Sequence, residues 1–312
     1  MKLRAAMAFV VLTVATTARA QLFSSLPRGS SALTAGTQPP EGLVLSGFVY
    51  NYHSTTIVGP HGNSVSTKGS LNIFTPGVTA WYVSPLKVFG AHYGAVLSMW
   101  FTSSRADFPT LNVTQSSYGF GDMYLKPLEL GWHTTYVDAI TGFTLRIPTG
   151  RYSPGGKDNS GQGQWGYEFS VGATVWFDKG HHLNLSTQAF YDIHSPKRGT
   201  KGQIQTGNTF SLMGGLGYQF LGGALNIGIP YFVQWKVTED TLPPSIDSVL
   251  PGIQAAKDYS VGLGAEVDLH WSTSDGVTAR FVQGFAGANT TNGQTYFLIY
   301  SHIFQLSGQS KS

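Results

Sequence analysis

The sequence predicts an all-β fold, a membrane-spanning antiparallel up-and-down β-barrel of about twelve strands over residues 42–305. Three observations lead to this prediction. Segments of about 10–15 residues alternate between apolar and polar side chains, which is the period of strands with one apolar face. Charged residues make up 11% of the chain, against roughly 25% in soluble domains. The connections between segments are alternately short and long, as in outer-membrane barrels.

The first twenty residues predict export. Lys2 and Arg4 precede an apolar run over residues 5–14, and residues 18–20 (Ala-Arg-Ala) form a small-x-small cleavage site. The run is too short to cross a bilayer as a helix, which takes about 20 apolar residues. We therefore expect a signal peptide over residues 1–20, cleavage after Ala20, and residence in the bacterial outer membrane among its lipids.

Charge and cysteine content exclude two classes of protein. The chain has 19 basic and 16 acidic residues, and removal of the three basic residues of the signal peptide leaves 16 against 16, a net charge of zero. Nucleic-acid binding needs clustered Lys and Arg, so no nucleic-acid partner is expected. The absence of cysteine excludes a scaffold held together by disulfides.

Two segments flank the predicted barrel. Residues 21–41 are rich in Ser, Thr, Gly and Pro and show no periodicity. They form either a flexible N-terminal leader or a segment tucked into the lumen. Residues 306–312 are expected to form a C-terminal tail.

The clearest strand covers residues 259–271. Its odd positions are apolar, whereas its even positions include Glu266, Asp268 and His270. The odd face should therefore meet lipid and the even face the lumen. The apolar faces of this segment and of residues 165–177 begin and end on aromatic residues, as the two membrane interfaces require. A soluble β-sandwich also alternates, but its strands usually have about five or six residues, so the barrel is favoured.

Counting such segments predicts twelve strands. They are residues 42–54, 69–83, 91–104, 118–131, 135–148, 164–177, 182–194, 205–219, 223–238, 257–271, 276–287 and 294–305. Connections after the even-numbered segments are short and most of the others are long, which places both chain termini on the periplasmic side. Pro76 and Pro127 predict bulges. The register of the first, second and fourth segments stays open.

Inward-facing side chains of these strands are the candidate lumen lining. They are Trp100, Arg146, Glu168, Phe190, Asp192, His194, Phe232, Gln234, Lys236, Glu266, Asp268 and His270. Along one strand, successive members of the row Glu266, Asp268 and His270 lie roughly 7 Å apart. This row is either a polar constriction with a weak cation site, or lumen filling that pairs with inward cations such as Lys126, Arg146 and Lys236.

Catalysis and metal binding have weaker support. Asp192 and His194 suggest an outer-membrane lipid hydrolase, but no serine motif accompanies them and both lie on the polar face. The pair His181-His182 sits in a turn and lacks a third metal ligand. We expect no catalytic residues, no metal and no cofactor.

Short Gly- and Pro-based motifs carry a resemblance to a known family. They are Gly119-Phe120-Gly121-Asp122, Leu130-Gly131-Trp132-His133, Pro148-Thr149-Gly150-Arg151-Tyr152 and Trp165-Gly166-Tyr167-Glu168-Phe169. In these motifs and in strand order over residues 42–305, the chain resembles the MetA-pathway of phenol degradation family. The resemblance implies a transporter-like outer-membrane protein associated with aromatic degradation. The last strand also resembles the terminal strand recognised by the barrel assembly machinery, an expected partner during biogenesis.

The expected function is passive passage of small solutes, hydrophobic or aromatic ones among them, through a narrow lumen. Barrels of roughly eight strands are filled by side chains and those of sixteen or more enclose a wide channel, so twelve strands favour a narrow path. The alternatives are a non-conducting structural or adhesive barrel and, with less support, the lipid hydrolase.

Overall fold

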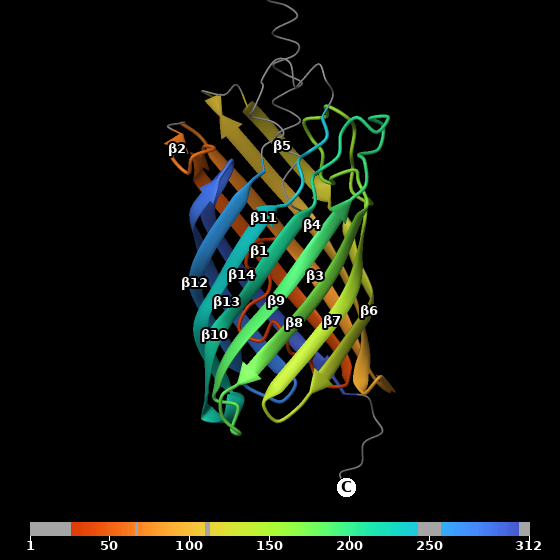
Figure 1. Ribbon diagram of the computed structural model, residues 1–312, viewed down its shortest axis with the longest axis vertical. Helices are drawn as coiled ribbons and strands as arrows, with labels where there is room; N and C mark the ends of the chain where they lie inside the picture. The colour runs from red at the N-terminus through yellow and green to blue at the C-terminus, as the bar shows by residue number, and fades with distance from the viewer. Residues whose placement is uncertain (1–25, 66–67, 110–112, 243–256, 306–312) are drawn as a thin grey trace, which may run out of the picture.

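A computed structural model describes residues 26–65, 68–109, 113–242 and 257–305. Antiparallel strands close on themselves in a tall barrel with a segment of chain inside it (Figure 1). The predicted signal peptide, residues 21–25, the predicted tail over residues 306–312 and residues 243–256 of a predicted long loop all lie outside the described residues.

Fourteen strands and one 3-10 helix are present in the described part. The strands are β1 Gly42–Val58, β2 Ser64–Val65, β3 Ser70–Val88, β4 Ala91–Phe108, β5 Val113–Phe120, β6 Met123–His133, β7 Val137–Ile147, β8 Gly166–Trp176, β9 Leu183–His194, β10 Thr209–Phe220, β11 Leu225–Lys236, β12 Tyr259–His270, β13 Asp275–Ala288 and β14 Thr290–Phe304; the helix is η2 Leu221–Gly223. No helix in this part of the chain is long and apolar enough to cross a membrane.

Twelve of the strands form the closed wall, which confirms the predicted fold. The order around the wall is β1, β3, β4, β6 and then β7 to β14, and β14 pairs with β1. The other two strands extend the wall: β2 pairs with the end of β1, and β5 pairs with the second half of β4.

Residues 118–131, predicted as one strand, are broken at Gly121 and Asp122. Strand β6 pairs with residues 92–98 of β4, whereas β5 pairs with residues 101–108 and has no strand on its other side in the described part. A Cβ atom on Gly121 would lie 2.1 Å from Nε1 of Trp100, so the chain can pass the indole here only with glycine. The prediction of one continuous strand was therefore wrong.

The lumen and lipid faces alternate as the sequence predicts. In β12, Ser260 and Glu266 are buried while Leu263 and Val267 are exposed on the outside of the barrel. The same alternation holds through β8, where polar Glu168, Ser170 and Thr174 are buried. In these two strands, apolar side chains are therefore outside and polar side chains inside, the reverse of a soluble protein.

The two prolines behave differently. Register shifts in both ladders of β6, between Leu125 and Leu128 on the β7 side, confirm the bulge predicted at Pro127. The bulge predicted at Pro76 is wrong: the pairing of β3 with β4 keeps one register on both sides of it, and only the pairs of Thr75 and Pro76 are missing. Proline lacks the N–H for the ladder, and here this interrupts hydrogen bonding without inserting a residue.

The barrel has a loop end and a turn end (Figure 1). The turn end carries short connections such as Phe89–Gly90 and η2, whereas residues 148–165 and 195–208 form long connections at the loop end. Two connections are shorter than predicted, because β3 runs to Val88 and because β13 and β14 are joined by Asn289 alone, with a φ of 51°. Polar residues at these strand ends extend the ladders beyond the apolar stretches that the prediction followed.

Candidate site in the barrel lumen

The described part of the N-terminal segment, residues 26–41, lies inside the barrel. We call residues 26–40 the plug. Its Gly36 N–H donates to the hydroxyls of Thr174 and Ser186, at 3.2 and 3.0 Å. The Thr37 hydroxyl donates to Asp138 at 2.9 Å. Of the two forms that the sequence leaves open for this segment, these residues take the one within the lumen.

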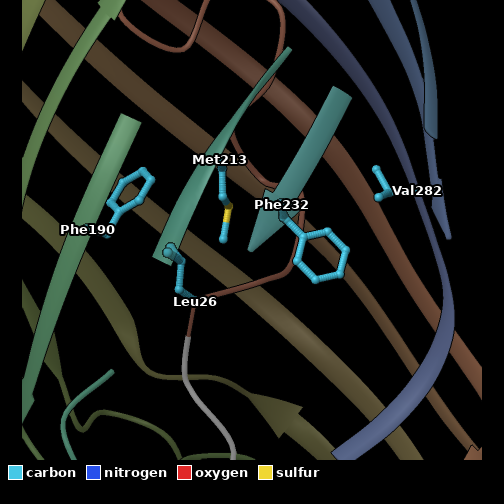
Figure 2. Packing of buried hydrophobic residues seen from close by; sticks show 5 residues of the cluster. All are labelled: Leu26, Phe190, Met213, Phe232 and Val282. Carbon is cyan, nitrogen blue, oxygen red and sulfur yellow. The ribbon is translucent and has the colours of Figure 1, made fainter. Parts of the chain in front are cut away.

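An apolar cluster holds the first residue of the plug. Leu26 is 7% exposed and belongs to a buried cluster with Phe190, Met213, Phe232 and Val282, from four different strands (Figure 2). These side chains break the polar pattern of the lumen where the plug begins. Burying a leucine side chain contributes roughly 1.5–3 kcal/mol, so the cluster stabilises the plug in the lumen.

Ion pairs line the lumen from β6 to β13. Arg146 of β7 pairs with Glu168 of β8 and, at 3.0 Å, with Asp192 of β9. The side chains of all three are at most 7% exposed. Charges in such surroundings must be paired, because the free energy of removing an isolated charge from water is large and no partner offsets it.

Three further cations follow the same rule and form four ion pairs. Lys236 lies 2.9 Å from Asp240 and 3.2 Å from Asp258. Arg280 of β13 pairs with Glu266 of β12, and its Nη1 also donates to the plug carbonyls of Gly29 and Ser30. The third cation, Lys126, pairs with Glu129.

The Pro127 bulge explains how Lys126 and Glu129 form their ion pair at 2.8 Å. Residues three apart on a regular strand point to opposite faces, but the bulge turns both side chains inward, where they are 6% and 1% exposed. Trp81 Nε1 and Gln38 Nε2 of the plug donate to the same carboxylate, at 3.0 and 3.1 Å. The bulge thus builds a polar anchor for the plug.

The opposite side of the lumen is mainly apolar and aromatic. We define the apolar wall as the cavity-facing side chains Val44, Phe48, Tyr50, Leu71, Ile73, Trp81, Val96, Trp100, Phe297 and Ile299, from β1, β3, β4 and β14. Ser and Thr side chains such as Ser46 and Thr79 lie between them. Between this wall and the plug is a cavity of about 1000 Å³.

The cavity extends along the barrel. Its lining includes Ser160 and Gln162 of the loop end, and Gln219 and His270 near the turn end. The plug and residues from both ends of the barrel therefore line one cavity.

Eight of the twelve predicted lumen residues line the cavity. They are Trp100, Arg146, Phe190, His194, Gln234, Glu266, Asp268 and His270. The other four, Glu168, Asp192, Phe232 and Lys236, are buried and at most 4% exposed. His270 differs from the rest because it is exposed, at the last position of β12.

The predicted partners of the acidic row are wrong. Lys126, Arg146 and Lys236 pair with other carboxylates, and Glu266 pairs with Arg280, which is absent from the predicted set. Arg280 faces Glu266 across the β12–β13 ladder. The alternation of residues 276–287 places Arg280 on the inner face, so this signal was present in the sequence. Asp268 accepts a hydrogen bond from the neutral amide of Asn226 at 3.2 Å.

Asp192 and His194, the two residues that suggest a lipid hydrolase, each have a separate partner. Asp192 pairs with Arg146, while His194 Nδ1 lies 3.2 Å from the carbonyl oxygen of Gly207. A catalytic triad needs the carboxylate to orient the histidine, which this arrangement does not provide. Within the described residues, no three His, Cys, Asp or Glu side chains gather where they could hold a metal ion.

A polar cluster fastens the long connections at the loop end. The Asp122 carboxylate accepts the N–H groups of Gly150 and Gln162, at 3.0 and 2.7 Å, and burial raises its pKa. Lys197 donates to the Gln162 carbonyl oxygen at 2.8 Å, and burial lowers the pKa of its amine to about 8. Asp122 thus ties residues 148–165 to the break between β5 and β6.

Comparison with known proteins assigns the chain to a family. The model of the family described as "Putative MetA-pathway of phenol degradation" matches residues 55–299, which is 245 of 312 residues. The chain belongs to this family. Family membership confirms the resemblance carried by the Gly and Pro motifs.

Solved structures support the fold of this family member. The COG4313 outer membrane channel from Pseudomonas putida F1 is 14% identical with a TM-score of 0.74, over 87% of this chain and 98% of that one. The translocator domain of autotransporter NalP from Neisseria meningitidis is 13% identical with a TM-score of 0.50, over 86% and 90%. At such identities the likeness shows the fold alone. Comparison with curated proteins gave no match.

Proposed function

We propose that the barrel is a passive channel for small hydrophobic solutes, monoaromatic compounds among them, which cross the outer membrane between the plug and the apolar wall. The observation that carries the proposal is the cavity, which is lined from the loop end to the turn end and is aromatic along β1, β3, β4 and β14. The name of the family, which refers to phenol degradation, agrees with aromatic solutes.

The two sides of the lumen have different roles in this mechanism. The apolar wall offers a hydrophobic solute a surface of rings and aliphatic side chains, and transfer of the solute from water to this surface is favourable. The opposite side has its charges paired and its plug hydrogen-bonded to the strands, so it keeps its shape while the solute passes. Transport follows the concentration gradient.

Uptake by intact cells tests the proposal. Gram-negative cells that lack the gene, and the same cells carrying it on a plasmid, are given radiolabelled benzyl alcohol, and initial uptake is measured over seconds. We expect the protein to raise the rate severalfold. Labelled maltose serves as a hydrophilic control that should not respond. Equal uptake of benzyl alcohol with and without the barrel would overturn the proposal.

The plug supports a second candidate, a non-conducting structural barrel. Residues 26–38 make hydrogen bonds to strands from β6 to β14, and this keeps part of the lumen closed. Single-channel recording in a planar bilayer separates the two candidates. Small, steady conductance steps are expected for a path beside the plug, and a correctly folded barrel without any conductance would favour the structural role.

A further inference from the structure

One cation of the lumen differs from the others in its partners. On the strands, Lys126, Arg146, Lys236 and Arg280 are all in ion pairs. Arg28, on the plug, also faces the cavity, yet no carboxylate of the described residues lies within 4.0 Å of it. The positive charge of Arg28 is therefore not balanced by a direct partner in that part of the chain.

Neutral acceptors hold Arg28 in place. Its Nη1 donates to the Thr291 carbonyl oxygen at 2.8 Å, its Nη2 to the Thr290 hydroxyl at 2.6 Å, and its Nε to the Gln234 side chain at 3.4 Å. A guanidinium has five N–H donors, so two remain after these three bonds. A half-buried guanidinium with two donors left can form a charge-assisted hydrogen bond with a carboxylate.

Aromatic rings of the apolar wall lie next to this charge. The Tyr52 hydroxyl donates to the same Thr291 carbonyl oxygen as Arg28, at 3.0 Å, which places β1 beside the guanidinium. Tyr50, two residues earlier on the same face of β1, has its ring centre 5.0 Å from that of Phe297. Both rings line the cavity. The Arg280 guanidinium carbon also lies over the Phe297 ring, 5.4 Å from its centre. Aromatic rings beside cationic side chains fit a ligand with a charged end and an aromatic body.

We propose that Arg28, Tyr50 and Phe297 form a binding site in the lumen for the carboxylate of a monoaromatic acid. The proposal rests on the proposed function, since the ligand is a solute in transit, and it narrows the solute class. Such a site draws aromatic anions into the path, in the way that cationic side chains favour anions in other pores.

Calorimetric titration of the full-length, detergent-folded barrel tests the site with three probes at pH 7. Benzoate has ring and charge, benzyl alcohol has the ring without the charge, and acetate has the charge without the ring. We expect benzoate to bind at least about tenfold more tightly than either of the others, because a charge-assisted pair adds to ring contacts. Equal affinity for benzoate and benzyl alcohol would overturn the site.

Two variants separate the charge of Arg28 from the position of the plug. Arg28→Gln should weaken benzoate binding about tenfold and leave benzyl alcohol within about twofold. The control is Ser31→Ala, which removes a plug hydrogen bond of 2.9 Å to Gln188 without changing any charge, and should leave benzoate binding within about twofold. If Ser31→Ala weakens benzoate as much as Arg28→Gln does, plug position rather than charge is responsible and the proposal falls.

The uptake experiment keeps this inference distinct from the proposed function. Suppose that the protein speeds benzyl alcohol uptake but that Arg28→Gln binds benzoate as tightly as the parent. This result would refute the anion site and leave the proposed channel function standing. Suppose instead that benzoate binding depends on Arg28 but that the barrel speeds the uptake of neither benzoate nor benzyl alcohol. This result would refute the channel function and support the anion site.

Discussion

Removing the Glu266 carboxylate should destabilise the barrel through Arg280. The two side chains are 3% and 7% exposed and form an ion pair between β12 and β13. A Glu266→Gln change leaves the guanidinium buried without its carboxylate. Breaking a buried pair from one side typically costs about 3–5 kcal/mol. Arg280 also donates to the carbonyl oxygens of Gly29 and Ser30, so we expect about 3 kcal/mol, the lower end of that range.

Urea unfolding in phosphatidylcholine vesicles, followed by tryptophan fluorescence, measures this loss. The control is Asp268→Asn, which removes a lumen carboxylate hydrogen-bonded to neutral Asn226 and should cost about 1 kcal/mol. The double variant Glu266→Gln, Arg280→Gln removes both charges and should recover most of the loss. A loss below about 1 kcal/mol for Glu266→Gln, or a double variant no more stable than the single one, would refute the reasoning.

Three further predictions concern the wall, the loop end and the orientation. Val78→Arg, on the lipid face at the middle of β3, should lower the free energy of unfolding in vesicles by about 2–4 kcal/mol. Thr79→Arg, at the next position, which lines the cavity, should lower it by less, and the opposite order would mean that the assigned faces are reversed. Asp122→Ala removes the acceptor of two backbone N–H groups and should make residues 148–165 sensitive to added protease, and unchanged resistance would contradict the role of Asp122 as a fastener. Cysteine at Lys157 should react with a membrane-impermeant maleimide on intact cells and cysteine at Lys179 should not, and labelling of the second site alone would invert the orientation.

Alternation predicted most of the strands and, in the most regular ones, their faces. The period of 2 in residues 165–177 and 259–271 assigns the side chains of β8 and β12 to the lumen or the lipid, and burial agrees except at His270, the exposed last residue of β12. Strand ends were harder to predict, because polar residues such as Thr290 continue the ladder after the apolar pattern stops. The break at Gly121 depends on the position of the Trp100 side chain on the neighbouring strand β4. The local sequence pattern around Gly121 does not contain that information.

Contacts inside the lumen were beyond prediction from a single strand. Glu266 and Arg280 are fourteen residues apart and meet only through the β12–β13 register. Residues 21–41 have no periodicity, so neither the path of the plug nor the position of Arg28 could be derived from them. Even a glycine on the lumen face can be constrained by the neighbouring strand, since a Cβ on Gly264 would lie 1.7 Å from the Phe281 carbonyl oxygen.

Filling the path tests the central claim most directly. Thr79 lines the cavity between the residues of the apolar wall, and its neighbour Val78 faces lipid and is 56% exposed. Thr79→Trp places an indole in the proposed path, while Val78→Trp places the same group outside the barrel. With equal amounts of each variant in the outer membrane, we predict that Thr79→Trp lowers benzyl alcohol uptake toward the rate of cells without the barrel and that Val78→Trp leaves it unchanged. Undiminished uptake in the folded Thr79→Trp barrel would contradict a path between the plug and the apolar wall.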